Sequence, residues 1–287
     1  EVGKGVEMGE VGGEEVNVVG SCFMGDAVWC SNNGPEMVRR VEVQAEFCNY
    51  HGIKLNMDKS TYTVVGGKRE VEPIEVGGKA CKIGRVDGCF KYLGINMSPT
   101  GRVKHEVGRL NHKVMEIYDV LDRKNLTPME VRHVINTVVV GMLQYSMQVV
   151  GLPRAFLKRV DARSARVMKL KSGIGMTSPL EQVFSSSKDM GLGITNMEDL
   201  QDAISITEMV IRLNSDGLAG EVARARLIDL KHRQGVLACP LDAEGLEESG
   251  VKRYGGHSFE YVQKVLMERN MEIKTRDEEM HRRMEGS

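Results

Sequence analysis

One aspartate in a predicted hairpin is the candidate for metal chemistry in this chain of 287 residues. Two apolar, β-prone runs between Glu15 and Ser31 flank Met24-Gly25-Asp26, and this pattern predicts a hairpin whose tight turn directs Asp26 outward. Carboxylate oxygens suit Mg²⁺, but a two-metal site needs carboxylates from separate strands. Asp26 alone therefore predicts a weak, vestigial metal ligand at most. The simpler interpretation, which we favour, is that aspartate stabilises the turn.

Several short motifs occur in a fixed order along the chain. The first three are Phe23-Met24-Gly25-Asp26, the segment 52–60 with the sequence GIKLNMDKS, and the segment 90–95 with the sequence FKYLGI. Two more follow in the second half, MLQY at 142–145 and GLGI at 191–194. Together and in this order, over roughly residues 12 to 210, they resemble the palm and thumb of reverse transcriptases of the non-LTR (LINE-like) retrotransposon family.

This resemblance implies roles for individual residues. Asp26 corresponds to the second metal-binding aspartate of the family, and Gly25 replaces the first. The upstream strand that carries the third acid in the family is absent from this sequence. The resemblance places Lys59 near the incoming triphosphate and Tyr92-Leu93-Gly94 near the primer end. It implies Mg²⁺ as the cofactor if the chain is active, and otherwise none. Because glycine offers no ligand oxygen, we expect no independent RNA-directed DNA polymerase activity. A solvated lysine and a packed strand are the plain alternatives for Lys59 and for Tyr92 with Leu93.

Positive charge gathers in the middle of the chain although the net charge is only -1. Residues 102–171 hold 14 Lys and Arg against 6 Asp and Glu, a difference of 14 − 6 = +8. Six of these cations recur on the predicted polar side of one helix, and such side chains bind phosphates without reading base sequence. They are Arg154, Lys158, Arg159, Arg163, Arg166 and Lys169. The pattern favours RNA or an RNA/DNA hybrid as partner, and a solvated helix face is the alternative.

The hydrophobic period and the helix-start signals predict an α+β chain. Antiparallel strands with one helix, from near Pro35 to His51-Gly52, are expected over 1–100 as a partial polymerase palm. After Gly101 the period changes to 3.6, which predicts a helical thumb over 101–215. Helices should start at Thr127-Pro128-Met129-Glu130, reaching about Val150, and at Ser178-Pro179-Leu180-Glu181. Residues 216–287 predict a helical extension whose charged end is a terminal helix, a partner-binding helix or a partly disordered tail.

Composition limits the functional class. No apolar run reaches the roughly 20 residues that span a bilayer, the 6 cysteines show no metal-ligand spacing, and no secretory signal is visible. These features predict a chain without a membrane partner, located inside the cell in the nucleus or an organelle. Two functions remain open. The chain is a fragment or relic of a reverse transcriptase, or a repurposed non-catalytic RNA-binding or scaffold subunit, with other protein subunits, of a ribonucleoprotein such as a ribosome.

Overall fold

The computed structural model describes residues 5–23, 26–56, 59–65, 74–76, 79–80, 82–83, 89–98, 100–249 and 259–273. The chain divides into two compact units, each with its own internal packing. The first unit contains the described residues up to 102 together with 212–249, and the second contains 103–211 together with 259–273. The chain first passes from one unit to the other at residues 102 and 103, directly after the change of hydrophobic period at Gly101.

The strands of the first unit are short and pair two by two. They are β1 (Val6–Val11), β2 (Glu14–Val18), β3 (Gly20–Phe23), β4 (Asp26–Trp29), β5 (Thr61–Tyr62), β6 (Glu75–Val76), β7 (Lys79–Ala80), β8 (Lys82–Ile83), β9 (Phe90–Tyr92) and β10 (Ile95–Met97). The pairs β1–β2, β3–β4, β6–β7 and β9–β10 are antiparallel, whereas β5 and β8 run parallel. No strand of the described segments pairs with more than one neighbour.

This pairing differs from the single antiparallel sheet that the sequence predicted. The hairpin at Asp26, the segment after Gly52 and the bend at Leu93 belong to separate ladders, and one of these ladders is parallel. Strands of two or three residues form few ladder hydrogen bonds, and glycine-flanked strands specify their pairing weakly. The α+β class is therefore confirmed as small, mostly antiparallel ladders with helices, and the polymerase palm stays a prediction.

Helix α1 (Gly34–Tyr50) begins and ends where the sequence predicted. The side chain of Asn33 caps its start by accepting a hydrogen bond from the Glu36 amide at 2.9 Å, and Pro35 lies in the first turn. Gly52 follows the helix with φ at +67°, a left-handed conformation that favours glycine. The Trp29 indole donates to Gln44 at 2.6 Å, so strand β4 is tied to α1.

Within its described residues, the first unit contains two further helices. Strands β1 and β2 pack on α8 (Leu218–Gln234), and a side chain at Gly9 would meet the Ala225 methyl at 3.2 Å. Helix α9 (Ala243–Ser249) also belongs to this unit, whereas α10 (Phe259–Glu268) belongs to the second. The predicted C-terminal extension thus contains three helices within its described residues, and these are shared between the two units.

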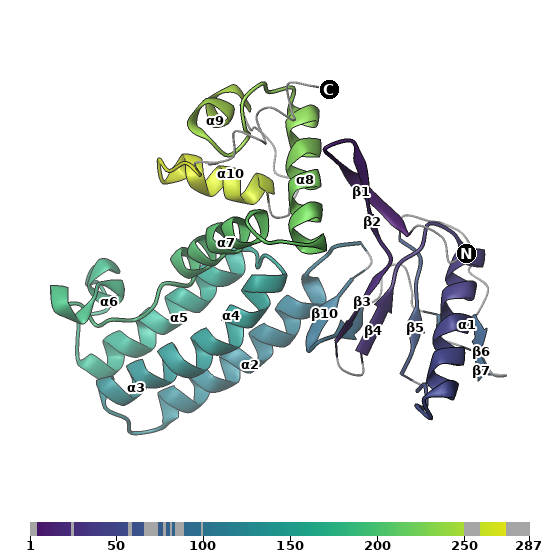
Figure 1. Ribbon diagram of the computed structural model, residues 1–287. Helices are drawn as coiled ribbons and strands as arrows, with labels where there is room; N and C mark the ends of the chain where they lie inside the picture. Colours follow the sequence, from purple (N-terminus) through teal and green to yellow (C-terminus); the bar gives the residue numbers. More distant parts are fainter. Residues whose placement is uncertain are drawn as a thin grey trace. The chain divides into compact units, whose positions relative to one another are not determined.

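The second unit is a helical bundle, as the 3.6-residue period predicted. Its helices are α2 (Lys104–Arg123), α3 (Pro128–Val134), a π-helical turn (Ile135–Val139), α4 (Val140–Val149), α5 (Arg154–Ser172), α6 (Glu181–Phe184), a short 3₁₀ turn (Ser187–Asp189), α7 (Met197–Leu213, which ends in the first unit) and α10. Helix α5 packs against both α2 and α3 (Figure 1). Among the described residues, no helix combines the length and the apolar composition that crossing a bilayer requires.

The core of this bundle contains the stripes that periodicity picked out. On α2, Leu110, Val114 and Leu121 are buried, and Val107 and Ile117 pack against the same core. The predicted inner face of α5, from Leu157 to Met168, is buried as well. At about 1.5–3 kcal/mol per fully buried large aliphatic side chain, this packing dominates the stability of the unit. The helical fold of the second unit is therefore confirmed.

One of the two predicted helix starts is correct and one is wrong. Thr127 and Glu130 form a complete capping box, and the helical path continues through the π turn to Val149. At the second predicted helix start, the helix begins only at Glu181, and neither Ser178 nor Leu180 provides a side-chain cap. The Ser178 carbonyl instead accepts a hydrogen bond from the Lys169 ammonium, so this segment is held by a tertiary contact.

Candidate nucleic-acid interface

The Asp26 hairpin does not form a two-metal site. Asp26 is the exposed first residue of β4 and pairs with Phe23 across the ladder, while Met24 and Gly25 lie outside the described residues. In the described part of the chain, no three His, Cys, Asp or Glu side chains gather into a possible metal-binding group. A lone carboxylate on an exposed strand end cannot hold two Mg²⁺ ions about 3.5–4 Å apart. The residues that the structure describes do not fit the metal pair that the resemblance implies.

Lys59 lies in a turn organised by Asn56. The Lys59 amide donates to the backbone carbonyl of Asn56 at 3.1 Å and to its side-chain oxygen at 3.3 Å. The Lys59 side chain is exposed, and it forms no hydrogen bond or ion pair with the described residues. This geometry leaves the ammonium available to an anion and equally to solvent.

Tyr92, Leu93 and Gly94 form the bend of the β9–β10 hairpin. Leu93 and Gly94 have φ angles of +44° and +84°, and Tyr92 pairs with the buried Ile95, which makes this a two-residue turn of the primed type. A left-handed conformation costs a residue such as leucine about 1–2 kcal/mol. No ladder of the described segments joins this bend to the turn at Lys59 or to the Asp26 hairpin.

Three of the six cations predicted on α5 form ion pairs or hydrogen bonds within the bundle. Arg154 pairs with Asp202 at 3.4 Å and with Glu268 at 2.9 Å, and its guanidinium carbon lies 5.8 Å from the centroid of the Tyr261 ring. Burial lowers the pKa of Arg154, but its hydrogen bond to Tyr261 and the charges of Asp202 and Glu268 outweigh this effect and raise it. Arg154 therefore fastens α10 to α5 and α7.

The side chains of Arg163 and Lys169 also bind groups within the bundle. Arg163 contacts Asp119 at 3.1 Å and Asp122 at 2.6 Å, which ties α5 to α2. Lys169 is only 5% exposed, and its ammonium donates to the carbonyls of Met176 and Ser178. The prediction that Arg154, Arg163 and Lys169 lie on an open phosphate-binding face is wrong, because carboxylates and carbonyls from elsewhere in the fold already surround these cations.

The other three cations are exposed. Lys158 has a side-chain exposure of 67% and one distant acidic neighbour, Glu198, at 4.0 Å. Arg159 and Arg166 are exposed and form no ion pair or hydrogen bond with the described residues. Seven positions apart on a helix of 3.6 residues per turn, they lie on one face about 10.5 Å from each other along the axis.

The exposed surface of α5 contains no acid. Its exposed residues are Ala155, Lys158, Arg159, Ala162, Arg166 and Leu170, and the single aspartate of the helix, Asp161, is buried. The small alanines leave the two arginines accessible from the side. We name Lys158, Arg159 and Arg166 the α5 basic face. It can attract a polyanion electrostatically without any catalytic group.

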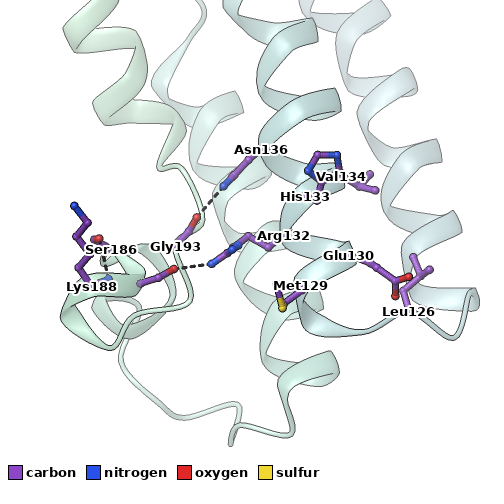
Figure 2. A pocket seen from close by; sticks show the side chains of 11 residues that line it. Leu126, Met129, Glu130, Arg132, His133, Val134, Asn136, Ser186, Lys188 and Gly193 are labelled. Carbon is purple, nitrogen blue, oxygen red and sulfur yellow. Dashed lines mark hydrogen bonds between the residues drawn. The ribbon is translucent and has the colours of Figure 1, made fainter.

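The GLGI motif forms one edge of a groove. Residues 191–194 lie beside 182–185, with Leu192 donating to the Gln182 carbonyl and Gly193 to the Ser185 carbonyl, both at 2.9 Å. A side chain at Gly191 would lie 2.1 Å from the Ser185 oxygen, so this approach requires glycine. Between this segment and α3 lies an open groove of about 1000 Å³, lined among others by Arg132, His133 and Lys188 (Figure 2).

Sequence reasoning missed the groove. Arg132 occupies the first helix after the capping box, and Lys188 follows a run of three serines, Ser185–Ser187, next to the glycines of GLGI. A serine run with a lysine beside a glycine-rich segment is a weak signal for an anion site, and it could have drawn attention to Lys188. No local sequence signal pairs Arg132 with this loop, because 55 positions separate Arg132 from Ser187.

No protein-family model matches the chain, and no curated protein matches its sequence.

Proposed function

We propose that the chain is a fragment or relic of a non-LTR reverse transcriptase whose helical unit binds RNA or an RNA/DNA duplex and which does not polymerise DNA by itself. The observation that carries the binding function is the α5 basic face, where Lys158, Arg159 and Arg166 are exposed without an acid among the exposed residues of the helix. Phosphate contacts of this kind supply most of the sequence-independent affinity for nucleic acid. The proposal includes an intracellular location, in the nucleus or an organelle.

The hairpin motif supports the non-catalytic part of the proposal. Gly25 occupies the position at which the resembling family carries a metal-binding aspartate, and Asp26 is the one carboxylate of that motif. Metal-assisted phosphoryl transfer depends on several carboxylates around two ions. Substitution of one essential ligand by glycine leaves nucleic-acid binding intact, because the α5 basic face lies in the other unit.

A second candidate is a non-catalytic subunit of a ribonucleoprotein, such as a ribosome, that binds RNA and contacts other protein subunits. The same α5 basic face favours it, because RNA binding there requires no catalytic hairpin. The two candidates differ in history and partners rather than in the chemistry of the face. Co-purification of a defined RNA and protein set with the full chain would favour the subunit, whereas binding of any duplex without protein partners would favour the relic.

The test of the binding function is a salt titration of RNA-hairpin affinity, measured by fluorescence anisotropy on the full chain. The variant with Arg159→Gln and Arg166→Gln loses two phosphate contacts, so its log–log salt slope should fall by about two units. A matched control carries Lys104→Gln and Lys113→Gln, which remove two exposed lysines of α2 that have no partner among the described residues. Equal slopes for the two double variants would refute binding through the α5 basic face.

Primer extension on an RNA template tests the other half of the proposal. With Mg²⁺ or Mn²⁺ supplied, we expect no extended product from the wild-type chain, because one aspartate cannot hold two ions. Template-dependent extension that disappears in an Asp26→Asn variant would overturn the claim that the chain is inactive.

A further inference from the structure

The groove between α3 and residues 186–193 has an excess of positive charge. Arg132 and His133 line it from the helix, and Lys188 lies on the loop side (Figure 2). The carboxylate in the lining, Glu130, accepts hydrogen bonds from the Thr127 amide and hydroxyl, both at 2.8 Å. These bonds lower the pKa of Glu130 and hold its charge at the helix start. Asp189 follows Lys188 in the chain but does not line the groove.

Arg132 is held in place within the groove. One guanidinium nitrogen donates to the Ser187 hydroxyl at 2.6 Å, which leaves the other N–H groups without a partner among the described residues. A side chain at Gly193, where φ is +68°, would lie 2.7 Å from that hydroxyl and 3.5 Å from the guanidinium. Gly193 therefore leaves the space in which this contact forms. A guanidinium fixed at one end and open at the other suits a phosphate oxygen.

Asn136 connects the two walls of the groove. Asn136 donates to the Gly193 carbonyl at 2.8 Å (Figure 2). It also accepts a hydrogen bond from the Thr195 amide at 3.1 Å. This pair of bonds keeps the 191–195 segment against the helical path, so the distance across the groove is set before a ligand arrives. Apolar surface lies beside the cations, since Met129 is 70% exposed and Leu126 lines the same groove.

We propose that this groove binds the phosphate of a nucleotide unit, with Arg132 and Lys188 contacting the phosphate and Met129 covering the sugar or base. The phosphate comes either from the backbone of a nucleic-acid strand or from a free nucleotide. In the first case the inference deepens the proposed function and rests on it, because the groove becomes a second contact of the same unit. In the second case it stands independently.

The experiment compares Lys188→Gln and Arg132→Lys with the control Lys113→Gln in the full chain. The Lys188 side chain has no partner among the described residues, so its loss should leave the fold intact, and Arg132→Lys retains the charge but removes the planar fork. The probes are inorganic phosphate and AMP, followed by NMR shifts of the Arg132 and Gly193 amides, and a single-stranded RNA oligonucleotide, followed by anisotropy against salt.

If a strand is the source, Lys188→Gln lowers the RNA salt slope by about 0.7 and the control leaves it unchanged. If a free nucleotide is the source, AMP shifts the two amides in wild type, the shifts weaken in both groove variants, and the RNA slope is unaffected. The inference is overturned if neither phosphate nor AMP moves these amides and Lys188→Gln leaves the RNA salt slope unchanged, or if both groove variants respond like wild type to every probe. If the wild-type chain shows AMP shifts but does not bind RNA, the proposed function is refuted, whereas the groove is still a nucleotide-binding site.

Discussion

Replacing Asp161 by asparagine tests how a buried carboxylate makes the helical unit sensitive to pH. Asp161 is 6% exposed, one of its oxygens accepts from the Met197 amide at 2.9 Å, and the other has no hydrogen-bond partner among the residues that the structure describes. Burial raises the pKa of Asp161 from 3.8 to about 6, although hydrogen bonds from the Met197 and Glu198 amides lower it. The negative charges of Glu198 and Asp199 raise it further.

The sign of the effect follows from proton binding. Between pH 3.8 and about 6 the folded chain binds more protons at Asp161 than the unfolded chain does. Stability rises with pH only where the unfolded state binds more protons, so the contribution of Asp161 to the free energy of unfolding falls as the pH rises through this window. A pKa difference of about two units corresponds to about 3 kcal/mol of unfolding free energy. Relaxation of water and protein around the charge reduces the effect, so this value is an upper limit.

The assay is urea unfolding of the full chain, followed by far-UV circular dichroism from about pH 4 to about pH 7. Asparagine retains the oxygen that accepts from the Met197 amide but carries no charge. The stability of wild type relative to Asp161→Asn should therefore fall by up to about 3 kcal/mol over this range. The control Glu181→Gln removes an exposed carboxyl and should follow wild type. Parallel curves for wild type and Asp161→Asn would show that burial does not govern this group.

Three further substitutions test the packing of the second unit, each by chemical denaturation of the full chain. Thr127→Ala removes the capping box and should cost about 1 kcal/mol, whereas Thr137→Ala, on the exposed side of the same helical path, should cost less; equal losses would contradict the cap. The Leu152 amide and carbonyl are each hydrogen-bonded to the Gln201 side chain at 2.8 Å. Gln201→Leu leaves both groups without these partners and should lower the free energy of unfolding by at least about 2 kcal/mol. An unchanged denaturation midpoint would mean that water replaces the side-chain amide. Gly191→Ala places a methyl group against the Ser185 carbonyl and should cost about 1–3 kcal/mol, and wild-type stability would show that the segment shifts freely.

Local signals predicted the local structure well. The capping box at Thr127, the start of α1 near Pro35 and the apolar stripe of α2 are each determined within a few residues of sequence, and the structure contains all three. The predicted start at Ser178 failed because a serine followed by proline also fits an extended segment. There the carbonyl of Ser178 is used by Lys169 rather than by a helix.

The candidate site was only half predictable because charge alone does not show which cations are already paired. Arg154 and Arg163 lie on the same helix as Arg159 and Arg166, yet their acidic partners come from positions more than 40 residues away in the sequence. Pairing of this kind depends on which helices become neighbours. In the first unit the hairpin around Asp26 forms as predicted, whereas the single sheet does not. Strands of two or three residues contain too few side chains to specify a partner in a larger sheet.

The π-helical turn at Ile135–Val139 has a consequence for how the length of this chain can change. Such a turn closes its hydrogen bonds over five residues instead of four, so it holds one residue more than the α-helix on either side. Deleting one exposed residue there, such as Val138, converts the turn to a regular α-helix while Val131 before it and Leu143 after it still point into the core. A deletion two turns later would instead rotate every following buried side chain of α4 by about 100°. Natural single-residue gaps among homologues of this helix should therefore collect at 135–139.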